Sequence, residues 1–157
     1  MYLQVNYSGI KVIRYLCYMA KDFSIRNLQE EDYETMVKWW KANRFPVVTR
    51  IMLPDNLNNG GLMVYYKDKP FCSGILYSTS SSYLFHAEWI VASTEIKDRE
   101  VRKEGLKFLI NGLIYVAEKK GAKIIYTSLI RDSLIDRFKD CGFQEGSKGS
   151  TEMVRIL

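Results

Sequence analysis

The chain has 157 residues, 47% of them apolar, and a formal net charge of +5 at pH 7 with a pI near 9.0. This length supports one hydrophobic core and one α/β domain, and apolar runs such as residues 62–66 are far shorter than the roughly 20 residues that span a bilayer. The positive charge favours anionic partners such as nucleic acid, phosphate-bearing cofactors or acidic proteins. The alternation of lysines and acids is, however, more typical of an ordinary solvated surface.

Cysteine and histidine usage restricts the chemistry further. Cys17, Cys72 and Cys141 are odd in number and share no CxxC spacing, so neither a disulfide framework nor a zinc site is indicated. A reducing compartment is expected, which means the cytoplasm, or the host cytoplasm for a viral protein. The single histidine, His86, excludes a multi-histidine metal centre and leaves one candidate for a Ser-His-Asp arrangement. We therefore expect no metal cofactor.

Residues 1–21 precede the predicted domain, and their sequence pattern differs from it. Residues 2–7 alternate like an edge strand and residues 10–19 are apolar enough for a second short element. Basic and aromatic residues interrupt this stretch, which is unlike the clean apolar region of a signal peptide. We expect an N-terminal extension, either an extra strand or helix packed on the domain or a poorly ordered segment. A single domain over residues 22–157 follows it.

The domain begins with a strand and a helix. Residues 23–28 are predicted as the strand, and the acids of residues 29–32 open the helix against its positive N-terminal dipole. Its expected buried face consists of Tyr33, Met36, Val37 and Trp40. Because neighbouring helical residues lie about 100° apart, we expect only one of Trp39 and Trp40 to face the core. The other would line a substrate mouth or form a partly covered surface aromatic. Pro46 ends the helix.

Three strands are predicted next, joined as an antiparallel meander. The segment of residues 54–61 has the composition of a turn. The strands and their connections follow in this order: strand 62–66, hairpin 67–70, strand 71–77, loop 78–82 and strand 83–91.

A long amphipathic helix follows the meander. Asp98 is its predicted N-cap and Gly121 its C-terminal stop. Apolar residues recur at the spacing of one helical face, at Val101, Gly105, Phe108, Leu109, Leu113, Val116 and Ala117. A strand is expected over residues 123–129, so the helix belongs to a strand–helix–strand unit. A short helix ending at residues 141–143 and a final strand over residues 152–157 complete the predicted order.

This order of elements resembles the GCN5-related N-acetyltransferase (GNAT) superfamily. In that family the long helix begins with Arg or Gln, two residues, Gly, one residue, and Gly or Ala, and residues 102–107 (RKEGLK) are similar. The short helix closed by Gly142-Phe143 and the final residues 153–157 (MVRIL) resemble the end of the family domain. The resemblance implies a mixed α/β (α+β) GNAT-like acyl-CoA N-acyltransferase fold, with a central sheet flanked by helices. Residues 32–40 with Leu53-Pro54, and residues 88–91, also resemble small GNAT-like proteins encoded by bacteriophages.

The resemblance implies acetyl-coenzyme A as co-substrate, with its pyrophosphate on the N–H groups at the start of the long helix. The candidate cofactor-binding residues are Ile90, Val91, Arg99, Arg102, Lys103, Glu104, Gly105, Arg131 and Phe138. Lys107 departs from the second small residue of the motif, and the loop from Val91 to Gly105 is longer than the family's usual spacing. Gly105 has an alternative explanation, as a core-facing glycine that permits close contact between helix and sheet.

Acetyl transfer to an amine needs a base for the amine proton and often an acid for the departing thiolate. Glu88 lies on the strand that in this family passes the thioester, so it is the candidate base, assisted by His86 on the same face. A polar pair on a solvated face is the alternative for both residues. The family's usual acid is a tyrosine, replaced here by Phe138, and its usual asparagine is replaced by Arg131. Either the thiolate leaves unaided, with a thiol pKa near 8.5, or Tyr126 or Ser128 supplies the proton.

We therefore expect an N-acetyltransferase that acts on a primary amine of a small molecule, a protein or a modified base. Splaying between the Glu88 strand and the strand at residues 123–129 would admit the pantetheine arm, as the resemblance implies. Family members often dimerise, so a homodimer is compatible with this prediction. One alternative is a GNAT-fold protein that binds coenzyme A or a partner with weak or no turnover. Another is a nucleic-acid-binding protein or nuclease, which no motif supports. No membrane association is expected.

Overall fold

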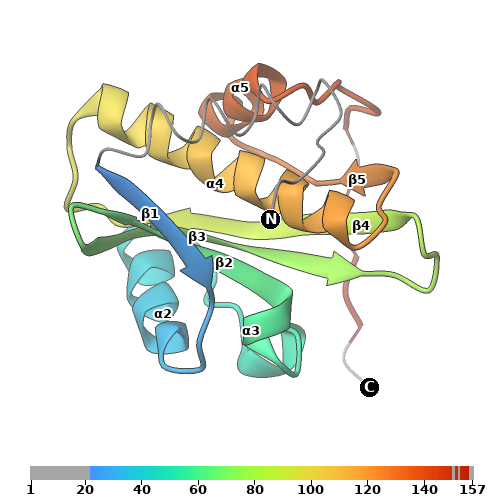
Figure 1. Ribbon diagram of the computed structural model, residues 1–157, viewed down its shortest axis with the longest axis horizontal. Helices are drawn as coiled ribbons and strands as arrows, with labels where there is room; N and C mark the ends of the chain where they lie inside the picture. The colour runs from blue at the N-terminus through green and yellow to red at the C-terminus, as the bar shows by residue number, and fades with distance from the viewer. Residues whose placement is uncertain (1–21, 150, 152, 156–157) are drawn as a thin grey trace, which may run out of the picture.

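The computed structural model describes residues 22–149, 151 and 153–155. Figure 1 shows its elements in chain order. They are β1 (Phe23–Asn27), α2 (Asp32–Ala42), the 3-10 helix η1 (Arg50–Met52), α3 (Leu57–Gly60), β2 (Gly61–Tyr66), β3 (Lys69–Ser78), β4 (Leu84–Ala92), α4 (Arg99–Lys119), β5 (Ile124–Tyr126) and α5 (Asp132–Asp140). The expected N-terminal extension, residues 1–21, lies outside the described residues. Within the described part of the chain, no helix combines the length and apolar character needed to cross a membrane.

One five-stranded mixed sheet organises the molecule. Its strands lie in the order β1-β2-β3-β4-β5, with antiparallel pairing from β1 to β4 and parallel pairing between β4 and β5. α4 makes the crossover between the two parallel strands and lies on one side of the sheet, whereas α2 and α3 lie on the other (Figure 1). This architecture confirms the predicted α/β fold with flanking helices and the predicted meander.

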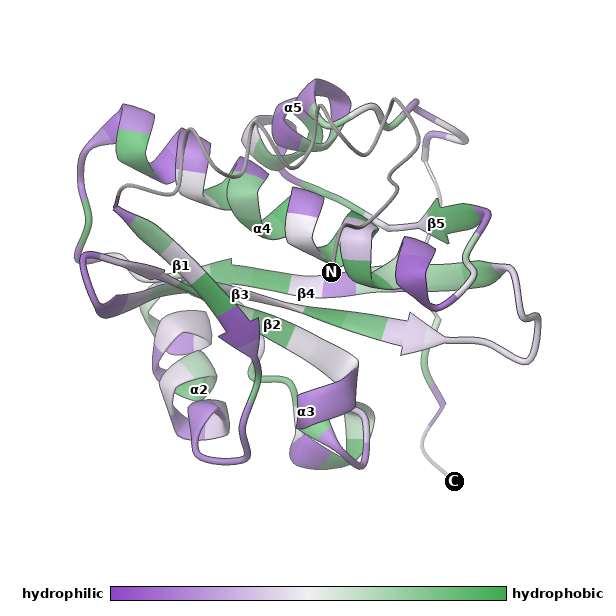
Figure 2. Ribbon diagram, in the orientation of Figure 1, coloured by the Kyte–Doolittle hydropathy of each residue, from purple (hydrophilic) through white to green (hydrophobic). Residues whose placement is uncertain are grey.

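Two hydrophobic clusters fill the two sides of the sheet. The cluster under α4 includes Phe71, Phe108, Leu109 and Leu113, all buried, and the cluster under α2 includes Met36, Met63 and Ile75. Strand residues are largely hydrophobic, while hydrophobic and hydrophilic residues alternate along α4 (Figure 2). The predicted face of α4 is confirmed, because each of its seven residues is buried or packed against the first cluster.

The prediction that only one of two adjacent tryptophans faces the core was wrong. Trp39 is 8% exposed and Trp40 is 2% exposed, and both belong to the cluster under α2. The irregular segment after the helix explains this, because its buried residues Val48 and Leu53 join the same cluster. In addition, the Asn43 side chain donates to the carbonyls of Trp39 and Ala92. α2 is therefore covered on two sides.

Two predicted strands differ from the structure. The strand expected over residues 123–129 is paired only at Ile124–Tyr126. Beyond Tyr126 the chain leaves β4, and Arg131 lies over the Phe45 ring, 4.2 Å from its centroid. The final strand expected over residues 152–157 is not formed at the described residues 151 and 153–155. There Met153 is 86% exposed, so its apolar side chain packs on no sheet.

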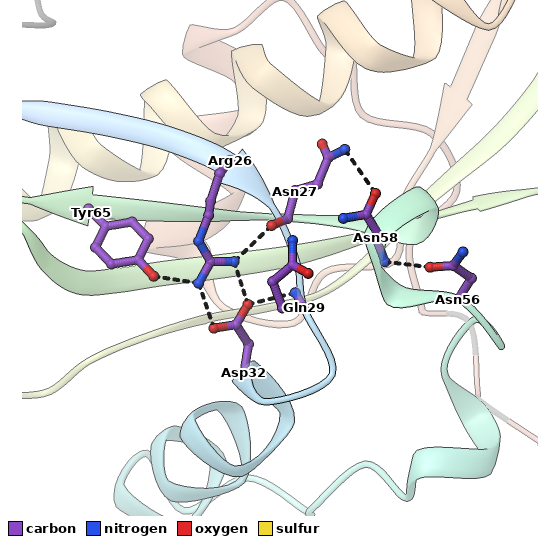
Figure 3. Close-up of polar contacts among 7 residues, drawn as sticks. All are labelled: Arg26, Asn27, Gln29, Asp32, Asn56, Asn58 and Tyr65. Atoms are coloured by element: carbon purple, nitrogen blue, oxygen red, sulfur yellow. Dashed lines mark hydrogen bonds and ion pairs between the residues drawn. The ribbon is translucent and has the colours of Figure 1, made fainter.

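A salt bridge ties β1 to the start of α2 (Figure 3). Arg26 makes two hydrogen bonds to the Asp32 carboxylate, at 2.7 and 2.9 Å, and a further one to the Tyr65 hydroxyl. Asp32 also accepts the backbone N–H of Gln29 at 2.7 Å. The hydrogen bond that Arg26 donates to Asp32 is the largest cause of a raised pKa for the Arg26 guanidinium. Asp32 therefore holds the turn between strand and helix.

Replacing Asp32 with Ala is expected to lower the free energy of unfolding by about 1.5–3 kcal/mol, the range for hydrogen bonds to charged groups. The substitution removes two hydrogen bonds from the Arg26 guanidinium and the acceptor of the Gln29 N–H. Urea denaturation measures the change. Glu34→Ala, at an exposed position of the same helical turn, is the matched control. Equal midpoints for the two variants would contradict the role assigned to Asp32.

Candidate functional site

A strained bulge interrupts β4 directly after Glu88. Ser73 of β3 pairs with Val91 and Ile75 pairs with Glu88, so two β4 residues, Trp89 and Ile90, lie opposite Gly74. Trp89 has φ +54°, a left-handed conformation that bulky residues rarely adopt. Bulges leave a residue unpaired and re-aim the side chains around it. Backbone strain of this kind clusters at functional sites, so the bulge marks this part of β4 as the candidate site.

A hydrogen-bond chain anchors the bulge. Trp89 Nε1 donates to the Tyr77 hydroxyl at 2.8 Å, and that hydroxyl donates to the Met52 carbonyl at 2.8 Å. Burial raises the pKa of Tyr77, the hydrogen bond from Trp89 opposes this rise, and the charge of Glu88 adds to it. The tyrosine therefore stays protonated at neutral pH. Sequence reasoning missed Tyr77, because only the strand register places it beside the other site residues.

Replacing Tyr77 with Phe is expected to destabilise the protein by about 1–3 kcal/mol, because it leaves the partly buried Trp89 Nε1 without an acceptor. Urea denaturation checks this value. Tyr83→Phe is the control, since Tyr83 is 60% exposed. Unfolding midpoints that agree between the two variants would show that the hydroxyl does not hold the bulge.

Three of the four predicted catalytic residues, His86, Glu88 and Tyr126, lie on one face of the sheet, whereas Ser128 follows the end of β5. His86 pairs with Tyr77 of β3 and with Tyr126 of β5, and directly paired residues share a face. The rings of His86 and Tyr126 lie 5.2 Å apart between centroids. Glu88 follows two residues after His86, so strand alternation places it on this face as well. Tyr126 is 54% exposed, which leaves this cluster accessible from solvent.

β4 continues past its partner strand. It runs to Ala92, whereas its parallel pairing with β5 stops at His86 and Tyr126. In the part of the chain that is described, residues 87–92 therefore have no strand on the β5 side. The side chains of Ile90 and Val91, predicted to bind the cofactor, pack in the two hydrophobic clusters. Only their backbone groups are placed to contact a ligand at this edge.

At the start of α4, groups that could bind a phosphate already have acceptors within the protein. Asp98 Oδ1 accepts the N–H groups of Glu100 and Val101, at 2.9 and 3.0 Å, which confirms the predicted N-cap. Arg102 Nη1 donates to the carbonyls of Ser93 and Ile96, at 2.6 and 3.0 Å. Arg102 therefore shapes the loop before the helix.

The other residues predicted to bind the diphosphate are exposed, paired with a neighbouring charge or buried in the core. Arg99 is exposed. Lys103 pairs with Glu100 at 3.9 Å, and Glu104 pairs with Lys107 at 3.6 Å. Gly105 is buried, and a Cβ there would lie 2.7 Å from Phe71 Cδ1. The structure thus shows the core-facing glycine that the sequence left as an alternative.

The remaining site candidates lie on the β5 and α5 side. Phe138 is 2% exposed, with its ring against Phe143 at 4.8 Å between centroids. Arg131 is exposed and donates to the Asn43 carbonyl at 3.3 Å. A pocket of about 550 Å³ is lined only by residues between 126 and 149, including Tyr126, Ser128 and Phe138. His86 and Glu88 do not line it, so the structure divides the predicted site between the pocket and the β4 face. The described residues contain no group of side chains that could hold a metal ion.

Comparison with known proteins places the fold. No protein-family model and no curated protein sequence matches the chain. N-acetylglutamate synthase from Neisseria gonorrhoeae, solved with coenzyme A and L-arginine, matches with a TM-score of 0.63 at 15% identity over 80% of this chain. The chain spans only 28% of that protein.

Two further solved structures match over nearly their whole length. Glucosamine-6-phosphate N-acetyltransferase from Arabidopsis thaliana has a TM-score of 0.60 at 12% identity, covering 86% of this chain and 100% of its own. An aminoglycoside acetyltransferase from an uncultured soil metagenomic sample, solved with trehalose, has a TM-score of 0.60 at 14% identity, covering 88% and 99%. The chain therefore has the GNAT acetyltransferase fold that its order of elements predicted.

Proposed function

We propose that this protein transfers an acetyl group from a coenzyme A thioester to a primary amine at the bulged part of β4. The observation that carries the proposal is the strained bulge at Trp89, which directly follows a carboxylate and lies on a strand edge that β5 leaves unpaired. Extended amide-bearing ligands add to such an edge by backbone hydrogen bonds. The pantetheine arm carries two amides, so the backbone of residues 87–92 would hold it.

The β4 face supplies the groups that proton transfer needs. Acetyl transfer forms a C–N bond and breaks a C–S bond, while the amine loses a proton and the departing sulfur gains one. Glu88 is the base for the amine proton, directly or through a water, and His86 assists it. Tyr126, in ring contact with His86, and Ser128 are the candidate hydroxyls for the sulfur. Tyr77 positions the bulge through Trp89.

The described residues fit the thioester end of coenzyme A well and its diphosphate end poorly. The open edge of β4 suits the pantetheine arm. At the start of α4, however, the Asp98 carboxylate occupies two N–H groups that a diphosphate would need. Phe138 is buried and offers no proton. These observations favour, as a second candidate, a protein that binds a thioester or a partner with slow or no turnover.

Calorimetric titration with acetyl-coenzyme A tests the proposal first. Binding with a dissociation constant in the range of about 1 μM to 1 mM, typical of enzyme substrates, supports it. A screen of primary amines for thiol release then identifies the acceptor. A folded protein that neither binds acetyl-coenzyme A at millimolar concentration nor releases thiol with any amine would contradict it. Binding without thiol release would favour the second candidate.

A further inference from the structure

We propose that the acyl donor is recognised through its pantetheine arm alone, with no nucleotide diphosphate held at the start of α4. This inference rests on the proposed function, because it concerns the donor of the same transfer. It replaces the diphosphate cradle expected from the sequence at residues 99–105. The donor class is then any acyl thioester of pantetheine. The group attached at the other end of the pantetheine arm, such as a nucleotide, does not matter for recognition.

Three backbone N–H groups at the start of α4, those of Glu100, Val101 and Arg102, already have acceptors. A helix N-terminus binds a phosphate through N–H groups that lack intrahelical partners. Here Asp98 accepts those of Glu100 and Val101 with its carboxylate, and its own carbonyl accepts the N–H of Arg102 at 3.0 Å. From Lys103 onward the N–H groups lie inside the helix, where they donate to the carbonyl four residues earlier. A diphosphate at this end would also face the negative charge of Asp98.

The charges around this end do not form an anion site either. Residues 95–105 carry four acids and four bases, so their formal charges cancel. Arg102 is committed to two loop carbonyls, and Lys103 lies within 3.9 Å of Glu100. Arg and Lys bind phosphate strongly when their donors converge on it, and here these two bases serve other acceptors. Gly105, the small residue of the motif, faces Phe71 and Phe23.

The β4 edge provides recognition that does not depend on the diphosphate. Beyond His86, no strand pairs with β4 on the β5 side within the described chain, and only at its end does the Ala92 carbonyl accept from the Asn43 side chain. Backbone N–H and C=O groups along such an edge match the alternating amides of an extended arm. The affinity of the donor therefore comes from the pantetheine amides and the thioester, and the nucleotide adds little.

Calorimetry with coenzyme A and with pantetheine, which lacks the diphosphate and nucleoside, tests the inference on the full chain. Dissociation constants that agree within about threefold are expected, since a good charge-assisted contact would separate them by tenfold or more. Arg99→Ala and Lys103→Ala are expected to leave both constants unchanged. Glu118→Gln, at the far end of the same helix, controls for a general change in surface charge.

Coenzyme A binding at least about thirtyfold tighter than pantetheine, with the difference lost in Arg99→Ala or Lys103→Ala, would overturn the inference and leave the proposed function in place. Absence of binding by both molecules at millimolar concentration would also overturn it. Thiol release from acetyl-coenzyme A is a separate measurement, and it tests the proposed function rather than the inference on donor recognition. A protein that binds both molecules equally but releases no thiol would support the inference on donor recognition and contradict catalysis.

Discussion

Replacing Glu88 with Gln is expected to lower the turnover number for acetyl transfer by a factor of about 10² to 10⁴, the usual contribution of a positioned general base. Gln preserves the shape of the side chain but cannot accept the proton of an ammonium group. Glu88 stands next to the strained Trp89 and two residues after His86, and its charge acts on the nearby Tyr77. Steady-state thiol release with the best amine of the screen gives the turnover number.

The affinity of the Glu88→Gln variant for the acyl donor shows whether Glu88 has a catalytic or a structural role. Calorimetry should give the same dissociation constant for the donor in wild type and Glu88→Gln, because the backbone of β4 holds the arm. Glu34→Gln, at an exposed position on α2, should change neither quantity. A Glu88→Gln protein with normal turnover, or one that loses donor binding and turnover together, would exclude Glu88 as the base.

Replacing Gly105 with Ala is expected to destabilise the protein by about 1–3 kcal/mol, the cost of adding a methyl group to a filled core. The added Cβ would lie 2.7 Å from Phe71 Cδ1 and 2.8 Å from Phe23 Cε1. Phe71 is 0% exposed and Phe23 is 8% exposed, so neither ring has solvent to move into. The gain in helix propensity from Gly to Ala, about 1 kcal/mol, offsets only part of this overlap.

Urea denaturation of Gly105→Ala tests this prediction, with Gly146→Ala as the control variant. No atom lies within 4 Å of a Cβ built at Gly146, and that residue is exposed. The midpoint should fall for Gly105→Ala and stay close to wild type for Gly146→Ala. A Gly105→Ala protein as stable as wild type would mean that α4 has room to move away from the sheet. The core-facing role of Gly105 would then be wrong.

Local signals in the sequence predicted the elements well. Asp98 caps α4 as expected, and Gly121, just after that helix, adopts φ +92°. Gly142 adopts φ +93° directly after α5, again as a helix stop. Each of these features depends on residues within one or two helical turns. For the same reason the periodic apolar face of α4 was predicted without knowledge of its partner strands.

Features that depend on long-range contacts were not predictable in this way. Both tryptophans of α2 are buried because the irregular segment after the helix folds back, so that Val48 and Leu53 join the same cluster. Tyr77 joins the site only through the register of β3 with β4. Residues 127–129 were expected to continue the strand, but pairing with β4 ends at Tyr126 and they lie outside the sheet. Composition alone does not reveal where pairing stops.

Backbone amide chemical shifts during titration with pantetheine test the central claim most directly, which is that the free edge of β4 holds the acyl donor. We expect the largest shift changes at residues 87–92, with smaller changes at Tyr77 and Tyr126, which flank His86. The amides of residues 99–103 should change little. Shift changes confined to the pocket between β5, α5 and residues 143–149, with β4 unaffected, would contradict the account.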